Sequence, residues 1–231
     1  MAAFLAPVGI LSFSNETLVL LALLGITICC VPLLMAYKKR SALHRAIARE
    51  LMKFRRIYHL AKHLGSNQDD HRPWFTELHA NIMGYLSFFA NKKTHDYFAS
   101  DEVFRKVSYH IYGAPDLIKK KDEVLYAELL DTTSDVASTR QEIKEIMLSG
   151  MSVSERMTMY CITNGIILAI LFGGASLNKS ATLFSGLLAV IVFLMSEMLA
   201  RVDSLVDVAN TMPQRYADNI AKLELRRREE E

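Results

Sequence analysis

The sequence predicts an all-α integral membrane protein with three transmembrane helices, an outer N-terminus, a cytoplasmic C-terminus and a helical cytoplasmic domain between the first and second spans. Three observations predict this class. Apolar runs at residues 18–37, 157–178 and 181–200 each come close to the length of about 20 residues that spans a bilayer. Lys and Arg residues gather directly after the first run. Apolar residues between the first and second runs recur at helical spacing.

The overall composition excludes several other classes. The 231 residues are 51% apolar and carry a formal net charge of +2. This content is too apolar for intrinsic disorder, and the charge is too small for a strongly basic nucleic-acid-binding protein, so we expect no nucleic-acid partner. The three Cys residues lie inside the apolar runs, which argues against a disulfide-stapled secreted domain.

The run at 18–37 is predicted to be an uncleaved anchor rather than a signal peptide. No Lys or Arg precedes it, whereas a signal peptide carries positive charge before its apolar core. Nine Lys or Arg residues follow between positions 38 and 63, against a single acidic residue, Glu50. The positive-inside bias therefore places this side in the cytoplasm. Residues 1–17 are then expected to form an outer apolar segment.

Residues 38–156 are predicted to form the cytoplasmic helical domain, since they hold twenty Lys or Arg, sixteen Asp or Glu and all seven His. A first helix over 38–64 could continue the first span as one rod, and a second helix opens at Pro73. Each has an apolar seam at helical spacing. The two seams are Leu43, Ile47, Leu51, Phe54, Tyr58 and Ala61, and Trp74, Leu78, Ile82, Tyr85 and Phe89.

The rest of the cytoplasmic domain is also expected to be helical. Ser100 is the predicted N-cap of a third helix. A long helix then runs from Pro115 to Ser149, about 50 Å at the rise of an α-helix, and is expected to pack against the first helix and, as a coiled coil, against another subunit. Ser152 and Glu155 fit a capping box that opens the next helix.

The runs at 157–178 and 181–200 are predicted to form an antiparallel transmembrane hairpin, because only a short turn separates them. Residues 201–231 then form a cytoplasmic helical tail. Pro213 is expected to end one helix, and a last helix at 214–231 is expected to dock on the long helix or on another subunit, because a short polar helix is marginal alone.

A small set of polar residues, Asn164, Ser196, Glu197 and Arg201, lies in or beside the hairpin. Ionisable groups inside membrane segments are rare and usually face a protein interior or water. Three interpretations remain open for Glu197. It can pair with Arg201 four residues later, bond to Asn164 or a neighbouring subunit, or line a pore or proton path.

A basic face on the first cytoplasmic helix is a candidate site for anionic lipid headgroups. The alternative is that this face only sets the topology. Its residues are Arg45, Lys53, Arg55, Arg56 and Lys62.

Motifs for chemistry are sparse. His59 and His63 have the i, i+4 spacing of metal ligands, but no Cys or carboxylate at ligand spacing completes a site. No GxGxxG, Walker A, HExxH, GxSxG or CxxC motif occurs, so we assign no catalytic residue, cofactor or metal. The R-x4-H spacing of Arg105 and His110 resembles that of HEPN-type ribonucleases, and Arg56 and His63 fit a looser R-x6-H form; a membrane-anchored ribonuclease of this type is a third hypothesis.

The layout of spans resembles, in topology, that of the proton-driven stator proteins of the TolQ and MotA type. This resemblance implies a homo-oligomeric ring in the cell membrane, with the hairpins inward and ions conducted along the axis. The competing hypothesis is a non-conducting scaffold in the bilayer whose cytoplasmic helices and tail recruit a membrane or cytoplasmic protein partner. Small residues in the hairpin and a long amphipathic helix fit both hypotheses.

Overall fold

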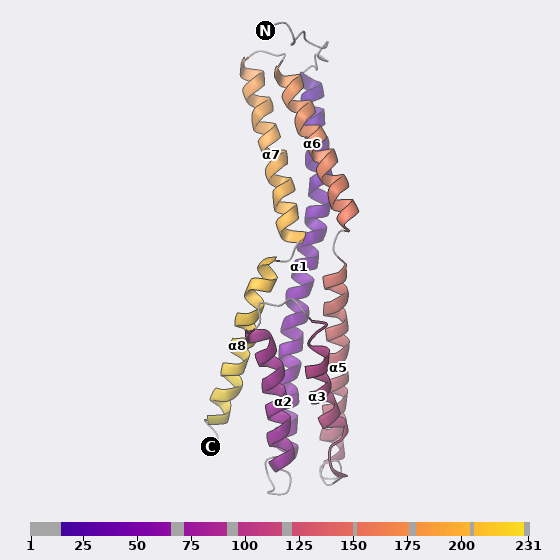
Figure 1. Ribbon diagram of the computed structural model, residues 1–231, viewed down its shortest axis with the longest axis vertical. Coiled ribbons are helices and arrows are strands. Elements are labelled where there is room, and N and C mark those ends of the chain that lie inside the picture. The colour runs from indigo at the N-terminus through magenta and orange to yellow at the C-terminus, as the bar shows by residue number, and fades with distance from the viewer. Residues whose placement is uncertain are drawn as a thin grey trace, which may run out of the picture. The chain divides into compact units, whose positions relative to one another are not determined.

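The protein is an assembly of α-helices. The computed structural model describes residues 15–65, 72–91, 97–116, 122–149, 152–175, 179–203 and 206–228, and no strand occurs within these ranges. The helices are α1 (Asn15–Gly65), α2 (Arg72–Asn91), α3 (Asp101–Tyr112), α5 (Glu123–Leu148), α6 (Val153–Ala175), α7 (Lys179–Asp203) and α8 (Val206–Arg228) (Figure 1). The all-helical class predicted from the sequence is confirmed.

The chain divides into two compact units. The first unit comprises Met1–Arg40 with Gly150–Leu205, and the second comprises Ser41–Ser149 with Val206–Glu231. Within the described residues, α1 is the one helix long and apolar enough to cross a membrane, and the apolar stretch Met157–Ile170 of α6 is shorter. The topology of three spans therefore stays a prediction.

Small side chains of α1 line the interior of the first unit. Ala22, Cys29 and Ala36 are buried, and Gly25 lies between them at helical spacing. A Cβ added to Gly25 would lie 3.1 Å from Ile166 of α6 and 3.4 Å from Val192 of α7. The backbone of α1 therefore approaches both other helices closely, and close approach through small residues is how helices associate where no hydrophobic force drives them together.

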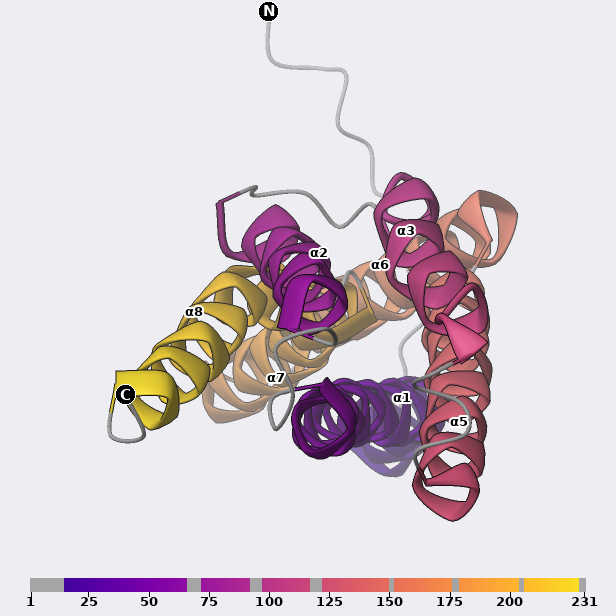
Figure 2. The same ribbon diagram turned by 90° about the horizontal axis from the view of Figure 1, so that it is seen from below.

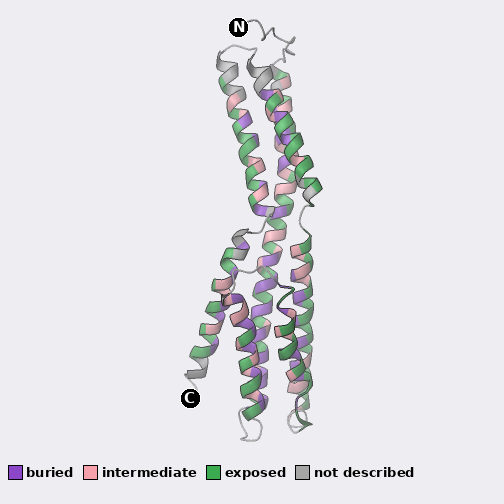
Figure 3. Cartoon of the chain, in the orientation of Figure 1, coloured by how far each residue is buried: buried purple, intermediate pink, exposed green. Residues whose placement is uncertain are grey.

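Many residues on the three helices of the first unit are exposed (Figure 3), and large apolar side chains are among them. They occur on α1, α6 and α7, so no single face accounts for them. A protein folded in water buries such residues, and a large exposed apolar surface marks contact with lipid or with protein. The exposed set includes Leu20, Leu23, Leu24, Val31, Leu34, Met35, Leu168, Leu183, Leu187, Phe193 and Leu194.

The second unit has the opposite arrangement, with large side chains inside. Every residue of the two predicted seams, on α1 and on α2, is buried, so those predictions are confirmed. Seen from below, α5 and α2 lie on adjacent sides of α1, and α8 packs on α2 (Figure 2). The predicted continuity of residues 18–37 with the helix at 38–64 is also confirmed, because α1 is unbroken past Pro32.

Two helix starts differ from the sequence predictions. Ser100 precedes α3 as expected but makes no capping hydrogen bond; its Oγ donates instead to the carbonyl of Tyr97, 2.7 Å away. The predicted long helix is shorter, since α5 begins at Glu123. Asp122 caps it, in extended conformation, by accepting a hydrogen bond from the amide of Leu125 at 3.0 Å.

The C-terminal tail also departs from expectation, while the capping box is confirmed. Pro213 does not end a helix but lies inside α8, because loss of one backbone hydrogen bond is offset where neighbouring turns are packed; Met212 and Tyr216 beside it are buried. α8 docks on α2 of the same chain. Ser152 and Glu155 exchange the two reciprocal bonds predicted, at 2.7 and 3.1 Å.

Candidate functional site

A buried carboxylate, Glu50 of α1, is the centre of a polar cluster inside the second unit. Its side chain is fully buried. Tyr85 of α2 donates to Oε1. Tyr97 before α3 and Tyr216 of α8 donate to Oε2 at 2.5 and 2.6 Å, and their hydroxyl oxygens lie 2.5 Å apart. Because these three tyrosines come from different segments, one carboxylate ties α1 to α2, to the turn before α3 and to α8.

Arg140 of α5 supplies the positive charge of the same cluster. One Nη atom lies 3.5 Å from Glu50 Oε1 and donates to the hydroxyl of Tyr85. The other donates to Ser100 Oγ at 2.8 Å and to Asp101 Oδ1 at 2.9 Å. A buried charge is tolerated only when it is paired and hydrogen-bonded, and the Arg140 guanidinium meets both conditions.

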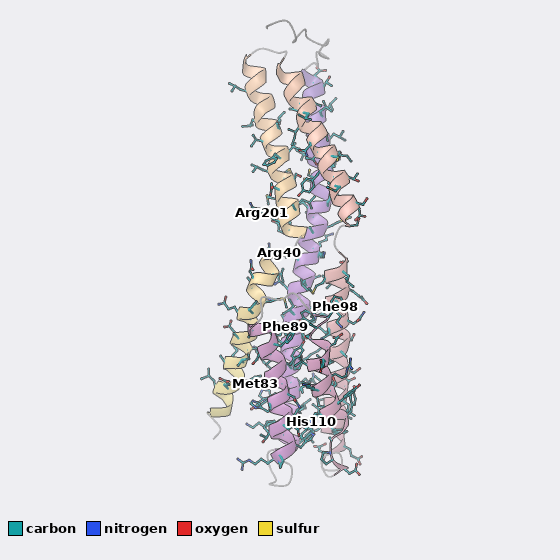
Figure 4. All side chains as sticks on the ribbon, viewed as in Figure 1. Arg40, Met83, Phe89, Phe98, His110 and Arg201 are labelled. Carbon is teal, nitrogen blue, oxygen red and sulfur yellow. The ribbon has the colours of Figure 1, made fainter. Side chains whose placement is uncertain are left out.

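Aromatic rings enclose the cluster. Phe54 stacks on Tyr85 with ring centroids 4.6 Å apart, and Phe89 stacks on Tyr216 at the same separation. Phe89 lies on α2 close to α8 (Figure 4). The Arg140 guanidinium carbon lies 4.7 Å from the ring centroid of Phe104, within range of a cation–π contact. The rings exclude water, which strengthens every electrostatic interaction inside the cluster.

The environment shifts the pKa values of the cluster in consistent directions. Burial, with the nearby Glu50 carboxylate second, raises the pKa of Tyr85, Tyr97 and Tyr216 well above the ordinary tyrosine value. Partial burial acts to raise the pKa of Asp101, but hydrogen bonds from Lys144 and Arg140 outweigh it and lower that pKa. The phenols therefore stay protonated as donors while Asp101 stays ionised.

Burial opposes the charge of Arg140, yet the surrounding oxygens prevail. Tyr85, Glu50 and Asp101 together raise the pKa of its guanidinium. Lys144 lies 2.6 Å from both Asp101 oxygens and closes the outer end of the chain of charges. Two acids and two bases thus alternate from the interior to the surface. This arrangement positions helices: the Glu50 carboxylate is fully buried, and the Asp101 carboxylate is exposed at the outer end of the chain of charges.

Sequence reasoning missed this cluster, although a signal was present. In the sequence Glu50 is the single acidic residue of a basic stretch. It lies three residues after Ile47 and four before Phe54, so it occupies the apolar seam of its helix. Arg140 lies three residues before the buried Ile143 of α5 in the same way. A charged residue at a seam position on each of two helices indicates a buried pair.

The basic face predicted to bind headgroups makes contacts within the chain at several positions. Lys53 Nζ lies 3.0 Å from Asp135 Oδ2 of α5, and Arg56 pairs with Glu128 of α5. Arg55 donates to Asn219 of α8, whereas Arg45 donates within its own helix to the carbonyl of Ser41 at 3.4 Å. Lys62 is partly exposed. Headgroup binding at these residues stays a prediction.

The ion pairs between α1 and α5 follow a regular pattern. Arg49 pairs with Glu142 at 2.6 Å, and Lys53 and Arg56 pair with partners one and two heptads earlier on α5. The predicted packing of the long helix against the first helix is therefore observed. The charges of these pairs are exposed or partly exposed, so screening by water keeps their contribution to stability small.

The polar residues predicted inside the hairpin all lie on described helices of the first unit. Glu197 and Arg201 of α7 form an i, i+4 pair, with Oε2 and Nε 3.8 Å apart, and both are exposed. Asn164 is exposed on α6, and Ser196 is partly exposed on α7. Thr163, beside Asn164, turns inward, where its hydroxyl lies 3.9 Å from Cys29 Sγ. A role of this set in conduction stays a prediction.

The R-x4-H residues do not converge on one site. His110 Nε2 lies 2.9 Å from the carbonyl oxygen of Trp74, and the indole Nε1 of Trp74 donates to the carbonyl of His110 at 3.3 Å. The two rings stack 5.8 Å apart. Arg105 is exposed and lies about 140° from His110 around α3, since five residues separate them. In the looser R-x6-H pair, Arg56 is bonded to Glu128.

Among the described residues, no group of three or more His, Cys, Asp or Glu side chains is placed to hold a metal ion. Comparison of the chain with protein-family models, with curated proteins and with solved structures finds no match.

Proposed function

We propose that the protein crosses the membrane three times, N-terminus outside and C-terminus in the cytoplasm, and assembles into a homo-oligomeric ring that conducts ions or is coupled to ion flow. The observation that carries this proposal is the chemistry of the outward face of α6. It differs from the outward faces of α1 and α7, although all three belong to one bundle.

The outward side of α6 has a stripe of small and polar residues, with exposed Met157, Ile162 and Leu168 beside it. Ser154, Thr158, Cys161 and Gly165 are exposed and fall within an arc of about 60° on the helix. This arc lies roughly opposite the buried Ile166 and Ile170, which pack into the bundle. A Cβ added to Gly165 would meet nothing within 4 Å. We call these four residues, with Asn164 beside them, the α6 outer face.

The outward face of α7 is of the opposite kind. Leu183, Leu187, Val190 and Leu194 are exposed there. Large apolar side chains suit lipid tails, whereas small and hydroxyl-bearing side chains suit a second helix or water. The contrast favours an assembly with α7 toward lipid and the α6 outer face toward neighbouring copies or an aqueous axis.

Disulfide cross-linking tests the arrangement directly, because Cys161 lies on the α6 outer face and is exposed. A variant with Cys29→Ala and Cys30→Ala leaves Cys161 as the only thiol. Mild oxidation in membranes is expected to produce a cross-linked dimer. The matched control lacks all three native thiols and has Leu187→Cys on the apolar face of α7. Absence of dimer from Cys161, or equal dimer from both positions, would refute the orientation.

Ion flux tests conduction. Purified protein in liposomes is expected to pass ions, and Asn164→Leu and Glu197→Gln are each expected to lower the flux several-fold. Leu187→Ala on the lipid-facing side serves as the control. Flux that is unchanged in both polar variants would remove these residues from the path, and no flux in the unaltered protein would leave the second candidate function.

The second candidate is a membrane scaffold that recruits a protein partner through the second unit. It is favoured by the outward face of α3, where Tyr109 and Tyr112 are exposed beside Arg105. Tyr and Arg are the residue types that dominate the energetics of protein interfaces. Capture of one defined partner by the full-length protein, lost in Tyr109→Ala with Tyr112→Ala and retained in Val124→Ala, would support this function.

A further inference from the structure

Asn219 of α8 is a fully buried amide whose hydrogen bonding is half complete. Its Oδ1 accepts a hydrogen bond from Nε of Arg55 on α1. Its Nδ2 is buried, and within the described residues no acceptor lies within hydrogen-bond distance of it. Buried amide donors are nearly always paired, so an unpaired one calls for an explanation.

Reversing the amide does not resolve the problem. Rotation by 180° would place the Asn219 NH₂ group against the N–H of Arg55, donor against donor. The Arg55 contact therefore fixes the orientation of the amide. In this orientation the two hydrogens of Nδ2 meet no acceptor among the described residues.

Arg55 differs from the neighbouring basic residues in what it contacts. Lys53 and Arg56 meet carboxylates of α5, so their charges are neutralised within the chain. Arg55 meets a neutral amide oxygen through Nε, and its side chain is partly exposed. The contact with Asn219 uses only Nε. The Nη donors and the positive charge of Arg55 can therefore bind a further acceptor.

The residues that flank this pair on both helices are basic. On α1, His59 and Lys62 lie four and seven residues after Arg55, on the same side of the helix. On α8, Arg215 and Lys222 lie four residues before and three after Asn219. Asp218 of α8 is exposed and lies about 100° around the helix from Asn219, and the buried Glu50 carboxylate accepts a hydrogen bond from Tyr216, three residues before Asn219. Basic residues on both helices favour an anion near this pair.

We propose that Arg55 and Asn219 form the inner end of a binding site for a phosphate group, flanked by the basic residues of α1 and α8. A guanidinium presents parallel N–H donors that match two phosphate oxygens, and the amide Nδ2 supplies a third direction of donation. The phosphate belongs either to a lipid headgroup or to a free ion. This site lies in the second unit and does not depend on conduction by the first.

The test measures thermal unfolding of the full-length protein in detergent, followed by the fluorescence of Trp74, the only tryptophan, which is buried in the second unit. Inorganic phosphate is compared with chloride at equal ionic strength. A ligand well above its dissociation constant is expected to raise the unfolding midpoint by about 3–10 °C. The rise is expected in the unaltered protein and in Arg56→Gln, and is expected to disappear in Arg55→Gln.

A second variant protects the test against misfolding. Asn219→Asp keeps an acceptor for Arg55 but replaces the amide donor with negative charge, so the fold is retained while a phosphate is repelled. Loss of the phosphate effect in Asn219→Asp, with a midpoint in chloride no lower than that of the unaltered protein, supports the site. An equal loss in Arg55→Gln and Arg56→Gln would show general charge screening and overturn it.

The two sources of phosphate are separated in nanodiscs. Phosphatidylcholine alone is compared with mixtures that contain phosphatidic acid, whose headgroup is a phosphate monoester. Stabilisation by phosphatidic acid without an effect of inorganic phosphate in detergent identifies a headgroup site, and the reverse identifies a free ion. No stabilisation in either arm means that Nδ2 meets only a water molecule, and the proposal is then wrong.

Discussion

The two stretches of α1 expose opposite kinds of side chain. In the first unit the helix buries Ala22 and Cys29 and exposes Leu20 and Leu24. In the second unit it buries Ile47 and Phe54 and exposes basic residues such as Arg49. In the first unit α1 therefore has small side chains inside and leucines outside. In the second unit it has large side chains inside and basic side chains outside. The apolar surface of the first stretch suits contact with lipid or protein, and the basic surface of the second suits contact with water.

The two units also differ in whether their ion pairs are exposed or buried. The first unit carries Glu197 and Arg201 as an exposed pair on α7, while the second unit buries Glu50 with Arg140 at its centre. A buried pair is costly to break, because removing one partner leaves the other desolvated and uncompensated. An exposed pair is nearly neutral for stability. The predictions below separate the units by the size of these effects.

The largest effect is expected from Glu50→Leu. Arg140 would lose its buried carboxylate partner and keep only Asp101, and three tyrosine hydroxyls would lose their acceptor, so the second unit should lose about 3–5 kcal/mol of unfolding free energy. Urea unfolding at constant detergent, followed by Trp74 fluorescence, measures the loss. Replacing both charges, in Glu50→Leu with Arg140→Met, should recover most of it. A loss below about 1 kcal/mol would show that the cluster does not hold the bundle.

Tyr216→Phe is expected to have the next largest effect. The substitution keeps the ring stacked on Phe89 and removes one hydrogen bond to a buried carboxylate, at a cost of about 1.5–3 kcal/mol. The same Trp74 unfolding curve measures it. Tyr109→Phe, at an exposed tyrosine, is the matched control and should change nothing. Equal effects at the two positions would contradict a special role for the α8 contact.

A size change at Gly25 probes the interior of the first unit. Gly25→Leu forces α1 away from Ile166 and Val192 and should cost about 1–3 kcal/mol. Circular dichroism during titration with sodium dodecyl sulfate measures the stability of the apolar bundle. Gly165→Leu, on the α6 outer face, should leave the bundle stable but weaken cross-linking between copies through Cys161. If Gly25→Leu is as stable as the unaltered protein, the close packing described for α1 is wrong.

Surface ion pairs should matter least at neutral pH. Glu142→Gln removes the partner of Arg49 and should change the unfolding free energy by less than about 1 kcal/mol, with a smaller change still in 0.5 M salt. Paired urea titrations at low and high salt measure the difference. An effect as large as that of Glu50→Leu would contradict the distinction between buried and exposed pairs.

Ionisation of the buried tyrosines is expected to lower the stability of the second unit only at alkaline pH. Burial and Glu50 raise the folded pKa of Tyr85, Tyr97 and Tyr216 above the unfolded value of about 10. Their contribution to stability is therefore complete below that pH and is lost as the pH rises toward the folded values. Absorbance at 295 nm measures tyrosine ionisation, and Trp74 fluorescence measures unfolding. In an alkaline titration these three phenols should ionise only at the pH at which the second unit unfolds. Ionisation of all nine tyrosines in the folded protein would contradict this burial.

The helical seams could be predicted because apolar residues recur along the sequence with the 3.6-residue period of an α-helix. Leu43 and Tyr58 on α1 and Leu78 and Phe89 on α2 were assigned to the interior on spacing alone, and all are buried. Helix ends were less predictable. Pro213 has a strong local preference to end a helix, yet packing of Tyr216 into the bundle outweighs it.

The candidate site was harder to predict, since its members are distant in the chain. Glu50 and Arg140 are 90 residues apart, and Glu50 and Tyr216 are 166 apart. Seam position alone shows that each residue points inward. Which residues meet depends on which helices become neighbours, and α8 was expected on the long helix or on another subunit rather than on α2.

The sequence alone determined the helical class, the periodic seams and the division into apolar and charged stretches, because each depends on neighbours within one or two helical turns. The tertiary structure decided the partners: that Glu50 meets three tyrosines and Arg140, that Arg55 meets the half-satisfied amide of Asn219, and that the α6 outer face points away from its bundle. Burial and the pairing of buried polar groups depend on contacts between distant segments, and only the folded chain specifies those contacts.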